Sequence, residues 1–142
     1  MSAPAKSPPR TGRALVLVFL GGTVGTGLRA LLSWPLSGEF PLGVLIANLS
    51  GSLALGLLLG VLSERGPDTG PRRELRLLLG VGLLGGFTTF SALAVDTVHL
   101  ASRSPGLGVA LVAGTLILGV AAAGFGLSAG ARLGRRNGRG AP

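Results

Sequence analysis

Four apolar stretches, each long enough to cross a membrane, dominate the 142-residue sequence. They cover approximately residues 14–33, 42–62, 75–100 and 106–128. A transmembrane α-helix needs roughly 20 apolar residues, because it rises about 1.5 Å per residue through the bilayer. A helix also satisfies its own backbone hydrogen bonds, which lipid cannot do. The pattern predicts an all-α integral membrane protein, with one four-span domain over residues 14–130.

Composition and charge exclude several other classes of protein. The chain has no cysteine and a single histidine, His99, so disulfide frameworks, zinc sites and multi-histidine metal sites are not expected. The net charge of +8 would suit nucleic acid, but the basic residues flank the apolar stretches and form no aromatic-interleaved patch. The glycine-rich tract at residues 21–27 lacks the strand that a phosphate-binding loop requires. We therefore expect no nucleic-acid partner and no enzymatic activity.

The third apolar stretch contains an unusual run from Leu79 to Ser91. It holds four glycines and then two β-branched residues, Thr88 and Thr89. Because both residue types are poor helix formers, the run predicts a third helix that breaks at mid-membrane. Freed carbonyl groups cannot face lipid, and broken helices often mark ion or substrate sites in transporters. The alternative is a continuous glycine-rich helix that packs closely on its neighbours.

Polar residues in the other spans are few. In the first span, Gly21 and Gly25 are spaced as a helix contact face, and Arg29 either snorkels to the interface or faces a water-filled vestibule. In the second span, Asn48 shares one helical face with small residues four apart, so it faces protein. Its amide either bridges helices or offers donors to an anion. Thr115 is the clearest polar side chain of the fourth span.

The distribution of charge predicts the orientation of the chain. Residues 1–13 are predicted to form a disordered basic tail, and residues 131–142 a second basic tail. Together with the connection between spans two and three, these tails hold eleven of the 13 Lys and Arg residues. The positive-inside rule then places both termini in the cytoplasm of a multi-pass cell-membrane protein. Asp96 and His99, near the end of the third span, receive no assigned role.

Three segments together resemble the Fluc family, also called CrcB, of small fluoride channels. They are GGTVGTGLRA at residues 21–30, PLGVLIANLSGS at 41–52 and GLLGGFTTFSAL at 82–93. The resemblance implies a passive, fluoride-selective channel that exports cytoplasmic fluoride and confers fluoride resistance. It also implies an antiparallel dimer of four-helix subunits with two narrow fluoride paths.

The same resemblance implies roles for individual residues. A structural sodium ion would be held by the main-chain carbonyls of Gly85 and Thr88, and of their counterparts in the partner subunit. Phe90 would line the fluoride path with the positive edge of its ring, with Ser91 beside it. The matching positions also place Asn48, Arg29 and, as the nearest polar residue of the fourth span, Thr115 along the path. Phe87 falls outside this pattern and is interpreted as packing.

The sequence departs from the family at positions that bear on assembly. The family's second phenylalanine corresponds to Leu93, and a hydroxyl residue before it corresponds to Ala92. An antiparallel homodimer also needs one sequence to insert in both orientations, which the eleven-to-two charge bias disfavours. We therefore hypothesise that the partner is a related subunit with the opposite charge bias.

Two other functions remain open at this point. A small four-span, proton-coupled drug exporter would need an acidic residue in the first span, where this chain has only Arg29. A non-conducting accessory subunit would account for the missing polar residues.

Overall fold

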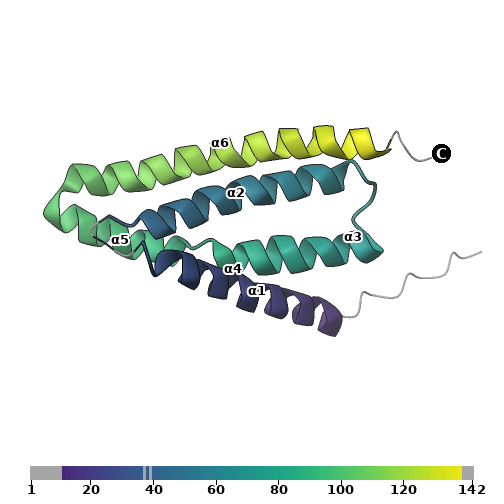
Figure 1. Ribbon diagram of the computed structural model, residues 1–142, viewed down its shortest axis with the longest axis horizontal. Helices are drawn as coiled ribbons and strands as arrows, with labels where there is room; N and C mark the ends of the chain where they lie inside the picture. Colours follow the sequence, from purple (N-terminus) through teal and green to yellow (C-terminus); the bar gives the residue numbers. More distant parts are fainter. Residues whose placement is uncertain (1–10, 37, 39, 139–142) are drawn as a thin grey trace, which may run out of the picture.

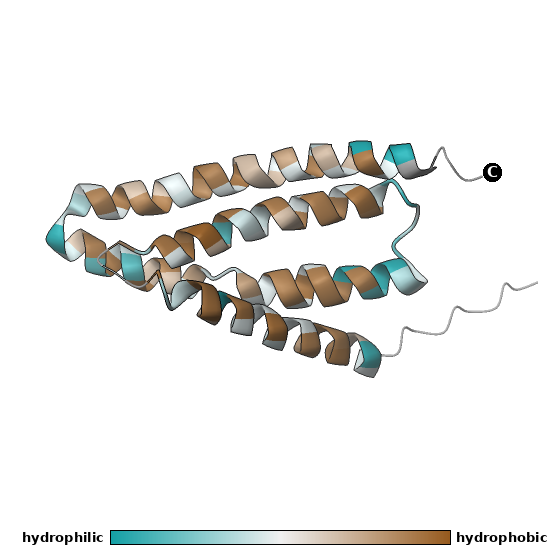
Figure 2. Ribbon diagram, in the orientation of Figure 1, coloured by the Kyte–Doolittle hydropathy of each residue, from teal (hydrophilic) through white to brown (hydrophobic). Residues whose placement is uncertain are grey.

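The computed structural model describes residues 11–36, 38 and 40–138 as a bundle of four long helical columns (Figure 1). All four columns are long and apolar enough to span a membrane, which confirms the predicted all-α membrane fold. The apolar residues run along the length of each column (Figure 2). The helices that form the columns are, in chain order, α1 (Thr11–Ser33), α2 (Leu42–Ser63), α3 (Gly70–Leu75), the π-helix η1 (Arg76–Leu84), α4 (Gly85–Phe87), α5 (Phe90–Arg103) and α6 (Pro105–Gly138).

The helices extend beyond the predicted spans. Residues 11–13 and 131–138, which were predicted to belong to the tails, are helical, and the third column runs from Gly70 to Arg103. The reason is that hydropathy marks only the part of a helix that suits lipid, whereas polar turns continue the helix at either end. Residues 1–10 and 139–142 of the predicted tails lie outside the described residues.

Glycines allow α2 and α6 to pack along most of their length. A Cβ atom on Gly56 would collide with the carbonyl oxygen of Ala123, and one on Gly60 with that of Leu127. From the opposite side, a Cβ atom on Gly126 would collide with the carbonyl oxygen of Leu53. This close approach of backbones is the usual basis of helix association in membranes, where lipid removes the hydrophobic driving force.

The predicted contact face of the first span is confirmed. Gly21 and Gly25 are buried, and a Cβ atom on either would collide with the backbone of η1, at Leu78 and Leu83 respectively. Gly82 is buried in the same contact. The first half of the glycine-rich run in the third span therefore serves packing, and the chain stays helical there, as the π-helix η1.

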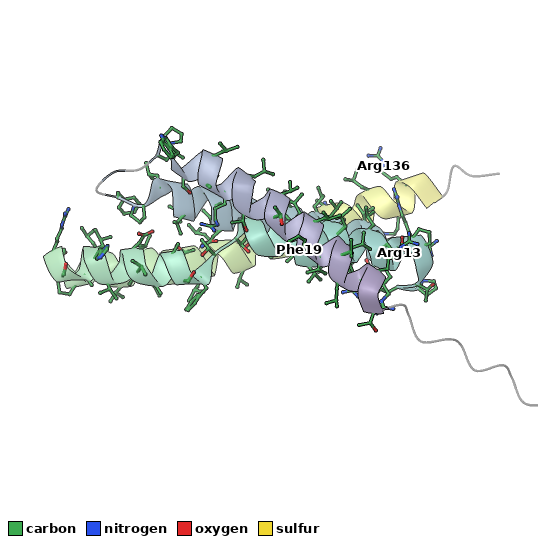
Figure 3. The ribbon with its side chains drawn as sticks, turned by 90° about the horizontal axis from the view of Figure 1, so that it is seen from below. Arg13, Phe19 and Arg136 are labelled. Atoms are coloured by element: carbon green, nitrogen blue, oxygen red, sulfur yellow. The ribbon has the colours of Figure 1, made fainter. Side chains whose placement is uncertain are left out.

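One end of the bundle gathers most of the charge. The start of α1, the connection between α2 and α3, and the end of α6 meet there, and we call this the basic end; Figure 3 labels Arg13 and Arg136 at it. Its three described acidic residues are each paired, in the ion pairs Arg13–Glu74 (2.8 Å), Arg76–Asp68 (2.6 Å) and Arg135–Glu64 (3.3 Å). Because successive columns run in opposite directions, both ends of the described chain lie at the basic end (Figure 1).

Candidate functional site

The third column breaks near its middle, at Thr88 and Thr89. The helix ends at Phe87, and both threonines are extended, with φ/ψ of −79°/154° and −149°/122°. The chain becomes helical again at Phe90, where the Thr89 hydroxyl accepts a hydrogen bond from the Ala92 amide at 3.2 Å. Thr89 is therefore the N-cap of α5, a position that hydroxyl residues favour. The predicted broken helix is confirmed, and the β-branched threonines form the break.

Asn48 of α2 holds the break through two hydrogen bonds. Its Nδ2 donates to the carbonyl oxygen of Thr89 at 3.0 Å, and its Oδ1 accepts from the amide of Thr89 at 2.8 Å. The side-chain amide thus replaces the backbone partners that Thr89 loses by leaving the helix. Asn48 does bridge helices, and one N–H of its amide is not used in this pair.

Helix α1 holds the other side of the break. The carbonyl oxygen of Gly86 lies 3.5 Å from Nε of Arg29 and 3.4 Å from the hydroxyl of Thr26, both of which donate to it. Arg29 is half-buried, and its guanidinium is directed at the backbone of the third column. The sequence reasoning missed Thr26 and the capping role of Thr89. The three-residue spacing of Thr26 and Arg29, which places them on one helical face, was the available signal.

Carbonyl groups at the break lose the amide donors that a continuous helix would supply. In a continuous helix the Thr89 amide would donate to the Gly85 carbonyl, but here it donates to Asn48. The Ala92 amide would likewise donate to the Thr88 carbonyl, but here it donates to the Thr89 hydroxyl. Both carbonyls therefore lose their helical donors. They belong to the two residues, Gly85 and Thr88, that the sequence resemblance marked as cation ligands.

A groove of about 390 Å³ runs beside the break, between α2, the third column and α6. It brings together five of the seven residues proposed from the sequence as site residues. The wall of the groove includes Asn48, Gly85, Thr88, Phe90 and Thr115. The remaining two, Arg29 and Ser91, are not part of its wall.

The side chains at the groove differ in what they can offer an ion. Phe90 is 73% exposed, so its ring is not enclosed by the rest of the chain. The hydroxyl of Thr115 donates to the carbonyl oxygen of Leu111 at 2.7 Å and is buried. Ser91 is exposed, and its hydroxyl lies 3.2 Å from that of Thr89. The hydroxyl groups are therefore engaged within the chain, whereas the Phe90 ring is exposed.

Leu93 lies in the core of the bundle and not at the groove. Its side chain is 2% exposed and packs with Leu100 and Leu111, with Val44 and Val112 against them. Leu93, which the sequence resemblance aligned with the family's second phenylalanine, is thus a buried packing residue of this chain.

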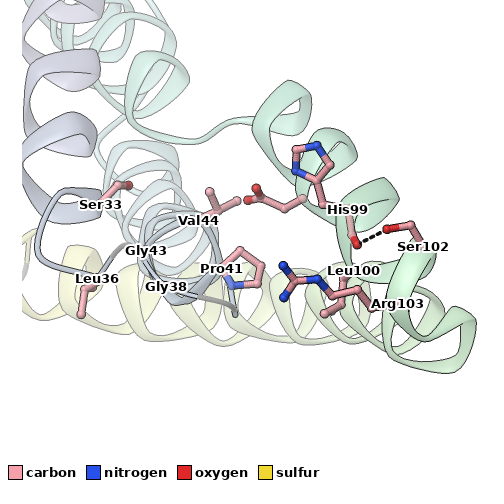
Figure 4. A pocket seen from close by; sticks show the side chains of 11 residues that line it. Ser33, Leu36, Gly38, Pro41, Gly43, Val44, His99, Leu100, Ser102 and Arg103 are labelled. Atoms are coloured by element: carbon pink, nitrogen blue, oxygen red, sulfur yellow. Dashed lines mark hydrogen bonds between the residues drawn. The ribbon is translucent and has the colours of Figure 1, made fainter.

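A second cavity, of about 560 Å³, lies at the end of the bundle opposite the basic end (Figure 4). It is lined by Asp96, His99 and Arg103 of α5, and by residues of α2 and of the connection that precedes it. The hydroxyl of Ser102 donates to the carbonyl oxygen of His99 at 2.7 Å. This cavity includes none of the seven site residues proposed from the sequence.

Comparison with known proteins places this arrangement in a family. Residues 16–127 match the family described as CrcB-like protein, Camphor Resistance (CrcB). The chain is 45% identical, over 89% of its length and 90% of the relative's, to the fluoride-specific ion channel FluC 2 of Leifsonia xyli. It is 40% identical to the fluoride-specific ion channel FluC of Novosphingobium aromaticivorans, over 81% and 94% of the two chains. With its four spans and broken third column, the chain belongs to the CrcB family.

Proposed function

We propose that this chain is a subunit of a passive channel that conducts fluoride across the cell membrane. The observation that carries the proposal is the break at Thr88 and Thr89, clamped by Asn48 beside a groove in the middle of a membrane bundle. Relatives over most of the chain carry the name fluoride-specific ion channel. Fluoride that enters a cell as its neutral acid ionises in the more alkaline cytoplasm, so a simple anion leak suffices to export it.

The fluoride path runs past the exposed face of the break. A dehydrated anion needs donors that replace its water, and the unused N–H of Asn48 and the ring edge of Phe90 are suitable. Ser91 and Thr115 contribute if their hydroxyl groups turn from their present acceptors, and Arg29 supplies positive charge on the α1 side of the break. Support comes from the placement of Asn48, Phe90 and Thr115 on one groove.

A sodium ion at Gly85 and Thr88 fits the same geometry. Hard cations prefer oxygen ligands, and carbonyl groups deprived of helical donors are available to coordinate one. Two neighbouring carbonyls are engaged, because that of Gly86 accepts from α1 and that of Thr89 accepts from Asn48. The two carbonyls of one subunit would need two more from a partner to surround the ion.

The channel is a dimer in this proposal, because one subunit leaves the groove and Phe90 open. Eight described arginines lie at the basic end, one (Arg103) lies at the opposite end, and Arg29 contacts the break. Such a bias favours insertion with the basic end in the cytoplasm, and so favours a related, oppositely biased subunit as antiparallel partner. Leu93 supports this pairing, since a buried leucine cannot serve as the second ring of a path.

Reconstitution into liposomes tests both the function and the partner. Vesicles loaded with potassium fluoride, with equal pH on both sides and valinomycin to carry potassium, report passive efflux to a fluoride electrode. We expect efflux from vesicles that hold this chain with an oppositely biased relative, and little from this chain alone. Robust efflux from the chain alone would refute the hetero-pair, and efflux only with a pH gradient would indicate a proton-coupled exporter.

Phe90 provides a test of the path itself. Phe90→Ile keeps an apolar side chain but removes the ring edge, so fluoride efflux from the active dimer should fall at least tenfold. Phe19→Ile is the matched control, because Phe19 is 72% exposed on α1 and lies outside the groove (Figure 3). Equal efflux from the two variants would remove Phe90 from the path.

A further inference from the structure

We infer that a groove at the basic end, between the start of α1 and the start of the third column, binds the headgroup of an anionic phospholipid. The groove has a volume of about 330 Å³. It is separate from the 390 Å³ groove beside the break and shares no lining residue with it. Arg13 and Leu17 of α1 face Arg73, Glu74 and Leu77 of the third column across it.

The two walls of this groove carry the same amphipathic pattern. On each wall an arginine at the basic end is followed four residues later by a leucine, as Arg13 and Leu17 on one side and Arg73 and Leu77 on the other. A four-residue step on a helix stays on one face and moves about 6 Å along the axis. Charge at the membrane interface thus stands above apolar surface one turn deeper, which matches a phospholipid phosphate and the beginning of its acyl chains.

The charge balance of the groove favours an anion. Glu74 contributes a carboxylate, but Arg13 pairs with it at 2.8 Å and offsets it. Arg73 has no carboxylate within 4.0 Å among the described residues and leaves the groove net positive. Basic pockets between membrane helices are known to bind anionic headgroups. The leucines argue for a lipid over free phosphate, because inorganic phosphate gains nothing from apolar walls.

Native mass spectrometry of the full chain in detergent tests the inference, with phosphatidylglycerol as probe and phosphatidylcholine as the uncharged comparison. We expect preferential binding of phosphatidylglycerol, weakened about fivefold by Arg73→Gln. The matched control is Arg136→Gln, which removes the same charge at the same end but outside the groove, and should cost less than twofold.

A gain of binding provides a test that misfolding cannot imitate. Glu74→Gln removes the negative charge from the groove and releases Arg13, so phosphatidylglycerol should bind several-fold more tightly. Glu64→Gln, which releases Arg135 outside the groove, should give a smaller gain. Equal effects of the groove and control variants would overturn the site in favour of diffuse attraction. Equal binding of phosphatidylcholine, or full competition by glycerol phosphate, would overturn the anionic lipid as ligand.

Discussion

Replacing Asn48 with alanine is expected to abolish fluoride efflux and to lower the free energy of unfolding by about 2–4 kcal/mol. The variant removes both hydrogen bonds to Thr89, at 3.0 and 2.8 Å. The backbone amide and carbonyl of Thr89 are then left without partners in the middle of the third column. Lipid cannot satisfy either group, so the break should collapse toward a helix or repack. Efflux from liposomes and thermal unfolding in detergent measure the two effects.

Two further variants distinguish the loss of the Asn48–Thr89 hydrogen bonds from a general loss of packing. Ser52→Ala changes another polar wall residue of the same groove, one turn further along α2, and should cost less than about 1 kcal/mol, a typical net hydrogen bond. Asn48→Asp retains an acceptor for the Thr89 amide but places a second oxygen against the Thr89 carbonyl, so it should remain inactive. An Asn48→Ala protein with normal stability and efflux would show that the Asn48–Thr89 hydrogen bonds do not hold the break.

Replacing Gly25 with alanine is expected to prevent α1 from docking on the third column. The added Cβ atom would collide with the carbonyl oxygen of Leu83, which belongs to the backbone and cannot rotate away. Separation of the helices would also withdraw Thr26 and Arg29 from the Gly86 carbonyl. We expect a loss of several kcal/mol, comparable to severe overpacking of a core, and little recoverable folded protein.

Gly27 on the same helix is the matched control for Gly25. A Cβ atom on Gly27 would meet nothing within 4 Å, and alanine is the better helix former by up to about 1 kcal/mol. Gly27→Ala should therefore give normal or slightly higher yield and melting temperature, measured by size-exclusion chromatography and thermal unfolding. If Gly25→Ala behaved like Gly27→Ala, the close packing of α1 on the third column would be wrong.

The spans and the broken column could be predicted because lipid imposes strong rules on sequence. A bilayer demands long apolar helices, so hydropathy alone locates all four columns. It could not locate the helix ends, since the polar turns at residues 11–13 and 131–138 continue as helix. The ends depend on local helix propensity and on ion pairs such as Arg135–Glu64, and not on lipid.

Residue chemistry alone could not place the break within the run, because glycine and threonine are both poor helix formers. What separates them is the neighbour that each one meets. Gly82 and Gly86 face α1 backbone and stay helical, whereas Thr88 and Thr89 meet α2 and the Asn48 amide. That partner lies 41 residues away in the chain, so only the folded bundle shows which part of the run packs and which part opens.

For Asn48, residue chemistry predicted the contact with protein but not the rest of its proposed role. Its place among small residues predicted a protein-facing amide, and its hydrogen bonds to Thr89 confirm that. The proposed role of Asn48 toward an anion would depend on the remaining N–H and on the proposed partner, neither of which a single sequence specifies. Arg29 is similar, since its contact with Gly86 depends on how closely α1 approaches the third column.

The most direct test of the account is anion selectivity in a single set of vesicles. Liposomes that hold the active channel are loaded with equal potassium fluoride and potassium chloride, with valinomycin to carry potassium and with no nucleotide or pH gradient. Efflux of both anions is followed with ion-selective electrodes. Fluoride should leave while chloride is retained, and Phe90→Ile should slow the efflux of fluoride alone. Release of both anions at similar rates, or of neither, would contradict a fluoride path at the break.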